Sequence, residues 1–293
     1  MSKRGWVLFA ALSVIWGVPY LLIRIAVRDF SPPTLVLCRT GTAGLAFVPW
    51  LFGRTRLQAL LRHWRPVIVY TLVEVSIPWL LLSRAEQRLT SSLAGLLIAT
   101  VPLVAIHLSR ATRQEGPLGW SRLAGLGLGF AGVAVIVGID VHGSDVLAVI
   151  EVLGVAVCYA TGPFIVARKL TGVPPTAVVG ASLVLTAIGY GPFGVTHLPN
   201  RVTPEELTSM IILVVVCTGA AFLIYFALIS EVGPARSTVI TYINPAVAVV
   251  LGITILHEPF STGLAIGVPL VLLGSFLGTG AEAESRTVPT DVE

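Results

Sequence analysis

Residues 19–24 read PYLLIR, and residues 163–168 read PFIVAR. Each segment runs from a proline to an arginine and is followed by a Pro-Pro pair, Pro32-Pro33 in one case and Pro174-Pro175 in the other. The two segments start 144 residues apart in a chain of 293 residues. This spacing indicates that one half of the chain repeats the other.

The correspondence continues further along both halves. The matched pairs are Pro102 and Pro245, Glu115 and Glu258, Gly125 and Gly267, and Gly132 and Gly274. Matches in the same order and at nearly the same offset are not expected by chance, even in so apolar a chain.

Composition assigns both halves to a membrane. Hydrophobic residues make up 55% of the chain, charged residues only 12%, and the mean hydropathy is +0.90, whereas a soluble domain is about a quarter charged. The apolar residues form blocks close to the roughly 20 residues that a helix needs to cross a bilayer. The ten blocks are 6–27, 33–52, 65–83, 90–109, 119–139, 146–167, 175–196, 208–230, 235–256 and 262–280. The sequence therefore predicts an all-α integral membrane protein with ten transmembrane helices.

Each half contains five of these blocks, an odd number, so the second half must enter the membrane from the opposite side. We expect residues 1–140 to form one five-helix repeat, residues 141–280 a second, inverted repeat, and residues 281–293 a disordered cytoplasmic tail. Inverted repeats can exchange conformations and open one central site to either face of the membrane.

Lysine and arginine gather in the loops on one side, which is expected to be the cytoplasmic side. That side holds Lys3, Arg4, Arg54, Arg56, Arg62, Arg65, Arg110, Arg113, Arg122, Arg168, Lys169, Arg236 and Arg286, and the other holds Arg24, Arg28, Arg84, Arg88 and Arg201. Both termini are therefore expected in the cytoplasm. The same bias explains the pI near 9.2 without a nucleic-acid partner. The three cysteines, Cys38, Cys158 and Cys217, lie in apolar blocks without metal-ligand spacing.

A longer motif closes the second half: residues 227–278 read ALISEVGPARSTVITYINPAVAVVLGITILHEPFSTGLAIGVPLVLLGSFLG. Together with WGVPY at 16–20 and Arg39 in LCRTG, this motif resembles the EamA-type transporters of the drug/metabolite transporter superfamily. The resemblance extends from about Gly5 to Gly280, but SRAEQRLTSS (83–92) is more charged than the usual turn of the family. It implies a secondary transporter, often an exporter of amino acids or other small metabolites, and leaves the substrate open.

Three ionisable residues lie inside apolar blocks. Glu74 is near the middle of block 65–83, where a charge costs about 2.5–3.5 kcal/mol unless it is paired, protonated or hydrated. Arg39 and Glu151 lie closer to one surface, so all three could share a cavity. For Glu74 we expect handling of a proton or cation, or binding of a substrate amino group. The alternatives are a structural ion pair between Glu74 and Arg39, a buried neutral Glu74, and a hydrated Glu151 near the interface.

Further residues complete the predicted substrate site: Trp16, Tyr20, Tyr70, Trp79, Tyr159, Tyr242 and Asn244. Any single aromatic residue of this kind is more often a packing residue or an interface anchor. Predicted helix breaks lie at Pro19, Pro78, Pro102, Pro163 and Pro245, because proline removes a backbone hydrogen bond. Glu258 is expected to have a structural role near the start of the last helix, where an acid complements the helix dipole.

The sequence predicts an inner-membrane secondary transporter that exports small metabolites such as amino acids. Arg39 suits a carboxylate, and Glu74 or Glu151 suits an ammonium group; export rests on the family resemblance. Expected partners are a small-molecule substrate, the lipid bilayer and protons as coupling ion, with no cofactor, metal or nucleic acid, and the chain is expected to be a monomer or weak homodimer. The alternatives are a membrane-embedded enzyme acting on lipid, for which no catalytic constellation emerges, and a channel.

Overall fold

The computed structural model describes residues 2–51, 53–111, 120–141, 143–232 and 240–285, and these residues are almost entirely helical. The first half contains α1 (Lys3–Ala26), α2 (Pro32–Leu51), α3 (Arg54–Arg62), α4 (Trp64–Tyr70), η1 (Thr71–Ser76), α5 (Ile77–Ala85), α6 (Ser91–Ile98), α7 (Val101–Ala111) and α8 (Trp120–Asp140). The second half contains η2 (Gly143–Asp145), α9 (Val146–Lys169), α10 (Pro175–Val195), α11 (Pro204–Val214), η3 (Val215–Ala220), α12 (Ala221–Val232), α14 (Ile240–Ile255) and α15 (Thr262–Ser285).

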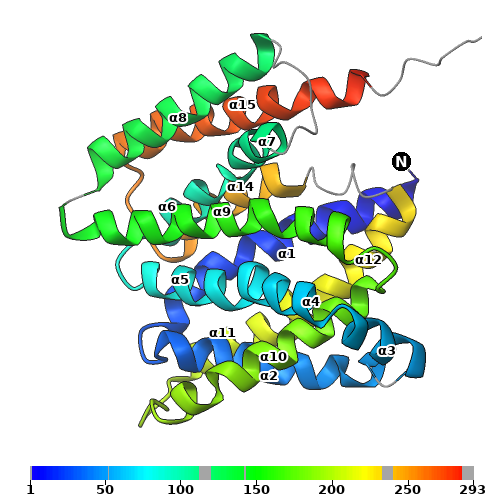
Figure 1. Ribbon diagram of the computed structural model, residues 1–293. Helices are drawn as coiled ribbons and strands as arrows, with labels where there is room; N and C mark the ends of the chain where they lie inside the picture. The colour runs from blue at the N-terminus through cyan, green and yellow to red at the C-terminus, as the bar shows by residue number, and fades with distance from the viewer. Residues whose placement is uncertain (1, 52, 112–119, 142, 233–239, 286–293) are drawn as a thin grey trace, which may run out of the picture.

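Two helix pairs flank the bundle (Figure 1). The helices α8 and α15 pack along each other at the top of the view, and α2 and α10 pack along each other at the bottom. Between them α1 contacts α14, and α5 contacts α9. The helices α1 and α9, which carry the matched segments PYLLIR and PFIVAR, run in opposite directions (Figure 1). The start of α1 and the end of α15 lie at the same end of the bundle.

The helices have the length and composition of membrane spans. Seven helical segments among the described residues are long and apolar enough to cross a bilayer: Lys3–Ala26, Trp64–Ala85, Ser91–Leu108, Leu123–Asp140, Val146–Lys169, Pro175–Val195 and Pro204–Val232. Shorter apolar helices add to them. Large apolar side chains cover the outside, such as Leu45 (73% exposed) and Phe276 (62% exposed), as expected of a surface in contact with lipid. The protein is a multi-pass membrane protein.

Two of the long segments contain a π-helical turn. The first, η1, joins α4 to α5, and the second, η3, joins α11 to α12. They begin at Thr71 and Val215, 144 residues apart, the same offset as the repeat. Such turns are rare and occur frequently at functional sites. The two halves therefore share the order of their helices and also a π-helical turn at the same position.

The prolines interrupt fewer helices than the sequence predicts. Pro102 follows a break, because α6 ends at Ile98 and α7 begins at Val101. Pro78 lies in the first turn of α5, directly after η1. The other three, Pro19, Pro163 and Pro245, lie inside α1, α9 and α14, which continue through them. The predicted break is therefore wrong at these three positions, since the loss of one backbone hydrogen bond does not end a helix held by its neighbours.

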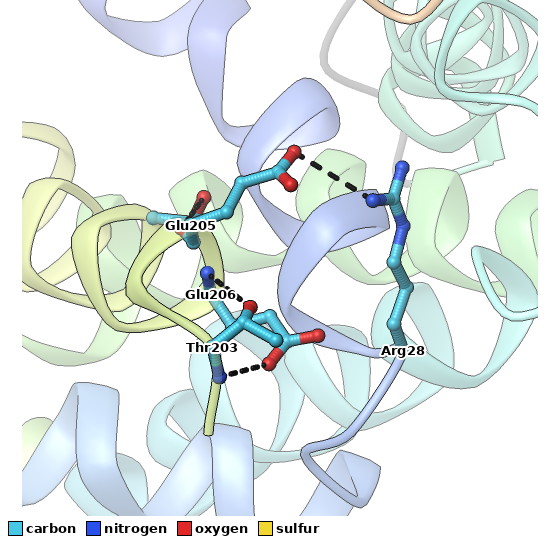
Figure 2. Close-up of polar contacts among 5 residues, drawn as sticks. Arg28, Thr203, Glu205 and Glu206 are labelled. Carbon is cyan, nitrogen blue, oxygen red and sulfur yellow. Dashed lines mark hydrogen bonds and ion pairs between the residues drawn. The ribbon is translucent and has the colours of Figure 1, made fainter. Parts of the chain in front are cut away.

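Polar side chains fix the start of α11 (Figure 2). Thr203 and Glu206 form a capping box, in which each side chain accepts a hydrogen bond from the other residue's backbone N–H. Arg28, from the connection between α1 and α2, forms an ion pair with Glu205 at 3.6 Å. Both partners are more than half exposed, so this pair contributes little to stability.

Candidate functional site

Glu74 lies in η1, and its side chain meets α9. A Cβ atom added to Gly162 on α9 would lie 1.7 Å from Glu74 Oε2, so the carboxylate occupies the space that the glycine leaves open. Glu74 Oε2 is buried and has no hydrogen-bond partner among the described residues. A buried acid oxygen without a partner is costly, and inside a membrane span it marks a functional site by default.

Two tyrosines lie near Glu74. Tyr70 and Tyr159 both lie within electrostatic range of its carboxylate, and Tyr70 also lies near Tyr225 on α12. The ring centroid of Tyr225 is 4.9 Å from that of Trp16 on α1. Two predicted aromatic residues, Tyr70 and Tyr159, therefore lie near the acid. The third, Trp16, is connected to Tyr70 only through Tyr225.

Arg39 on α2 crosses from the first half to the second. Its Nε donates a hydrogen bond of 2.9 Å to Thr218 Oγ1 in η3, and its guanidinium carbon lies 3.7 Å from the ring centroid of Trp79. Arg39 is only 7% exposed. Thr218 is the repeat counterpart of Glu74, since the two positions lie 144 residues apart in the matching π-helical turns. At the same point, one half presents an acid and the other a hydroxyl that holds an arginine.

The predicted ionisable residues do not form one cluster. The ion pairs seen in the described part of the chain are Arg28–Glu205 and Arg84–Glu151, and neither includes Arg39 or Glu74. Glu151 Oε1 lies 2.9 Å from Arg84 Nε and lines a small cavity of about 60 Å³ together with Arg84, Gln87, Arg88 and Leu147. Glu151 is therefore paired at an end of the bundle. Arg39 and Glu74 are separate groups that share Tyr159 as a neighbour.

Three predicted residues remain. Tyr20 on α1 is buried and lies near Arg39 and Tyr159, so it adds a further aromatic ring next to Tyr159. Asn244 lies on α14, where its backbone packs against Gly17 of α1. A Cβ atom added to Gly17 would lie 2.9 Å from the Asn244 carbonyl oxygen. The backbone of Tyr242 lies in α14, but its side chain is outside the described residues.

The sequence predicts a structural role for Glu258 at the start of the last helix, where the acid would complement the helix dipole. Its carboxylate instead accepts hydrogen bonds from the backbone N–H groups of Ser91 and Ser92, at 2.7 and 3.0 Å, and from the Ser92 hydroxyl at 2.5 Å. Glu258 therefore caps the start of α6, in the other half of the chain. The expected partner was wrong because the acid precedes α15 in sequence but reaches the free N–H groups of another helix in space.

Two site residues, and one buried acid outside the site, are not predicted by the sequence. Gly162 and Thr218 carry no signal of their own, because glycine and threonine are common in membrane helices. Glu86 lies in the unusually charged segment SRAEQRLTSS, which was the available signal. Glu86 is completely buried, and neither of its carboxylate oxygens has a hydrogen-bond partner in the structure as described.

The arrangement combines a lone buried acid, a buried arginine and an aromatic lining between two halves of a helical bundle. These groups can bind and release a proton, a cationic group and an anionic group, and none of them forms a nucleophile with an adjacent base. Helices with the length of membrane spans around such a centre define the class of membrane transporters.

Comparison with known proteins identifies the family. Residues 3–138 match the EamA-like transporter family, and residues 146–279 match it a second time. The chain belongs to this family. EamA-like proteins are transporters rather than enzymes, which removes the lipid-modifying enzyme from consideration. The two matched segments also indicate a duplicated arrangement.

Relatives extend over nearly the whole chain. The "Uncharacterized inner membrane transporter YedA" of Escherichia coli (strain K12) is 28% identical over 289 residues, which cover 91% of this chain and 90% of the relative. The "Uncharacterized transporter YvbV" of Bacillus subtilis (strain 168) is 26% identical over 276 residues, covering 92% and 90%. A solved structure described as "Crystal structure of protein" superposes with a TM-score of 0.68 at 19% identity, covering 97% of this chain and 100% of the other, and is similar in fold.

Proposed function

We propose that this membrane transporter is a secondary active exporter of small metabolites such as amino acids, and that Glu74 binds the coupling proton. The observation that carries the proposal is the buried, unpartnered Oε2 of Glu74 at the boundary between η1 and α9. A transporter that couples to protons needs a group whose charge changes within the membrane, and such a group must be neither permanently paired nor freely solvated.

The proposed mechanism is alternating access between two inverted repeats, residues 1–140 and 141–280, each with five transmembrane helices. The opposite directions of α1 and α9 support inversion (Figure 1), as do the two π-helical turns at equivalent positions. In this topology both termini lie in the cytoplasm of a cell whose inner membrane holds the protein. Two similar halves can exchange conformations around a site between them, provided that the two resulting states of the protein differ only slightly in energy.

The substrate class follows from the two unlike groups near Tyr159. Arg39 presents a guanidinium that can meet a carboxylate, while Glu74 presents an acid that can meet an ammonium group. An amino acid carries both. The remaining lining residues, Trp16 and Tyr70 among them, offer apolar faces to a side chain. Proton binding and ammonium binding at Glu74 compete, which would link export of the substrate to entry of a proton.

The test uses purified protein in proteoliposomes and a panel of radiolabelled L-amino acids measured by counterflow. We expect at least one amino acid to exchange with saturation, which a channel would not show. A pH gradient should then drive its net movement in the wild type. Glu74→Gln should reduce that driven movement on the order of 10-fold or more while the variant still inserts into the membrane.

Glu205→Gln is the matched control, because Glu205 is exposed and its ion pair with Arg28 contributes little. It should transport as the wild type does. If Glu74→Gln showed the same proton-driven transport as wild type at every pH, the coupling role would be excluded. If no amino acid exchanged while other metabolites did, the substrate class would be wrong and the coupling test would continue with the metabolite found.

A further inference from the structure

Glu86 is a second buried acid outside the site described above. It directly follows α5, in the turn that leads to α6, where a solvated side chain would be expected. Instead Glu86 is 0% exposed, and both carboxylate oxygens are buried without a hydrogen-bond partner among the described residues. An ionised carboxylate in that position would be buried without hydrogen bonds from the described residues to stabilise its charge.

A basic side chain from α1 binds the backbone of Glu86. Arg24 on α1 donates a hydrogen bond from Nη1 to the Glu86 carbonyl oxygen, at the end of α5, where unpaired carbonyls favour a cation. The charged and titratable groups that act on the Glu86 carboxyl are Arg24 and Tyr20 on α1, Arg39 on α2, and Glu258 from the loop before α15. Arg24 and Arg39 are positive, Glu258 is an acid, and Tyr20 carries a phenol.

The two acids, Glu86 and Glu258, have very different surroundings. Glu258 receives three hydrogen bonds from Ser91 and Ser92 at the start of α6, and these donors together with the helix dipole stabilise its negative charge. Glu86 receives none. When two acids lie close together, the one without donors takes the proton. Burial, and to a smaller extent the charge of Glu258, raise the pKa of Glu86 well above its ordinary value, against the opposing effect of Arg24 and Arg39.

One tyrosine lies within electrostatic range of Glu86, and a second lies within that range of Glu74. Tyr20 lies within electrostatic range of both Glu86 and Tyr159, and Tyr159 lies within the same range of Glu74. Tyr20 is buried. A phenolic hydroxyl both donates and accepts hydrogen bonds, so a tyrosine that is hydrogen-bonded on both sides can relay a proton.

We propose that Glu86 is a second proton-binding site, which holds a proton in the conformation seen here and exchanges it with water when this end of the bundle opens. The Glu258 cap on α6 joins the two halves of the chain at this end, so opening must remove or rearrange the contact and expose Glu86. Transfer of the proton toward Glu74 through Tyr20 and Tyr159 rests on the proposed transport function; binding of the proton to Glu86 does not.

The first experiment observes the proton itself. Infrared spectra of the purified protein are recorded across pH 5–9, and the carbonyl bands of protonated carboxyl groups are measured. In the wild type we expect such a band to persist at neutral pH. Glu86→Gln should lose it, whereas Glu205→Gln, at an exposed acid, should keep it. An unchanged set of bands in Glu86→Gln overturns the proposal.

The second experiment measures thermal stability against pH. A carboxyl group whose pKa is raised by folding stabilises the folded state fully below its unfolded pKa, and that contribution is lost as pH rises through the folded pKa. Wild-type Tm should therefore fall relative to Glu86→Gln as pH rises from 5 to 8. A constant difference between the two proteins contradicts a bound proton. If Glu86→Gln does not fold, Arg24→Gln decides: removal of the opposing charge should move titration of the infrared band to higher pH, and an unmoved band overturns the proposal.

The outcomes separate this proposal from the proposed function. A band that depends on Glu86 and not on Glu74 supports proton binding at Glu86 even if Glu74→Gln transports normally, in which case only the coupling role of Glu74 fails. If the neutral-pH band depends on Glu74 alone, the second site is absent and the proposed function stands.

Discussion

Glu74 and Gly162 face each other across η1 and α9, and the position of the acid depends on the missing side chain. A Cβ at position 162 would lie 1.7 Å from Glu74 Oε2. The methyl group of an alanine there could therefore not coexist with the carboxylate in its observed position. The pair therefore defines where the charge lies relative to Tyr70 and Tyr159. This dependence gives a test of the site that leaves the acid itself unchanged.

We expect Gly162→Ala to reduce pH-driven transport by on the order of 10- to 100-fold, because displacement of a reacting group by about an ångström has effects of that size. Transport is measured in proteoliposomes after confirming membrane insertion. Gly154→Ala on the same helix is the control, since its Cβ would make an ordinary contact of 3.5 Å with Leu81 Cδ1. Equal transport in the two variants would show that the position of the Glu74 carboxylate does not matter.

The sequence could identify some site residues and not others for physical reasons. Glu74 and Arg39 stand out because a charge inside an apolar block is costly. Their separation could not be predicted, because it depends on which rotamer Arg39 adopts and on Thr218, a residue far away in sequence. Glu86 resembles a solvated loop residue, and only the packing of α1 and the Glu258 loop around it makes it buried.

At the scale of the helix, the π-helical turns determine how the two halves face each other. Thr218 in η3 donates its hydroxyl to the Leu213 carbonyl at 2.9 Å and accepts Arg39 Nε at 2.9 Å. In η1, Ser76 and Thr186 on α10 share a hydrogen bond of 2.7 Å, and the Tyr190 hydroxyl donates to the Ser76 carbonyl. Each turn is thus tied by side chains to the helix pair formed by α2 and α10.

Thr218→Val should destabilise the protein by about 1–3 kcal/mol, because Arg39 Nε would remain buried without an acceptor. The change is expected as a lower Tm of the protein in detergent. Thr254→Val tests the same substitution at an exposed hydroxyl on α14 that donates to the Val250 carbonyl, and should leave Tm nearly unchanged. Similar losses in both variants would mean that Arg39 finds another acceptor.

The helices themselves were largely predictable, since the length of an apolar block reports a membrane span. All ten predicted blocks overlap helices of the structure, with residues 52, 119 and 235–239 outside the described part of the chain. The short helix α3 was not predicted, because it lies between blocks and has no membrane signature. The π-helical turns were not predicted either, since one extra residue in a turn does not change hydropathy.

At the scale of the whole molecule, the Glu258 cap on α6 is a contact between the two halves, and it depends on close packing. A Cβ at Gly252 on α14 would lie 2.3 Å from Glu258 Oε2 and 2.3 Å from the Ser92 hydroxyl oxygen. This glycine therefore provides the space in which the acid of one half meets the helix start of the other. If the halves separate here during transport, the contact must be strong enough to close that end and weak enough to open.

Gly252→Ala should separate these two properties. Overpacking of this kind costs about 1–3 kcal/mol, and the cost falls on the conformation in which the cap is formed, so the equilibrium should move toward the conformation open at this end. We expect a lower Tm together with faster labelling of a cysteine introduced at Ser91 by a membrane-impermeant maleimide, added from the side that the proposed topology makes extracytoplasmic. Gly138→Ala is the control, because among the described residues no atom outside its own stretch of helix lies within 4 Å of its Cβ position. A lower Tm without faster labelling would mean that the cap stabilises the fold in every conformation and does not close the transport path.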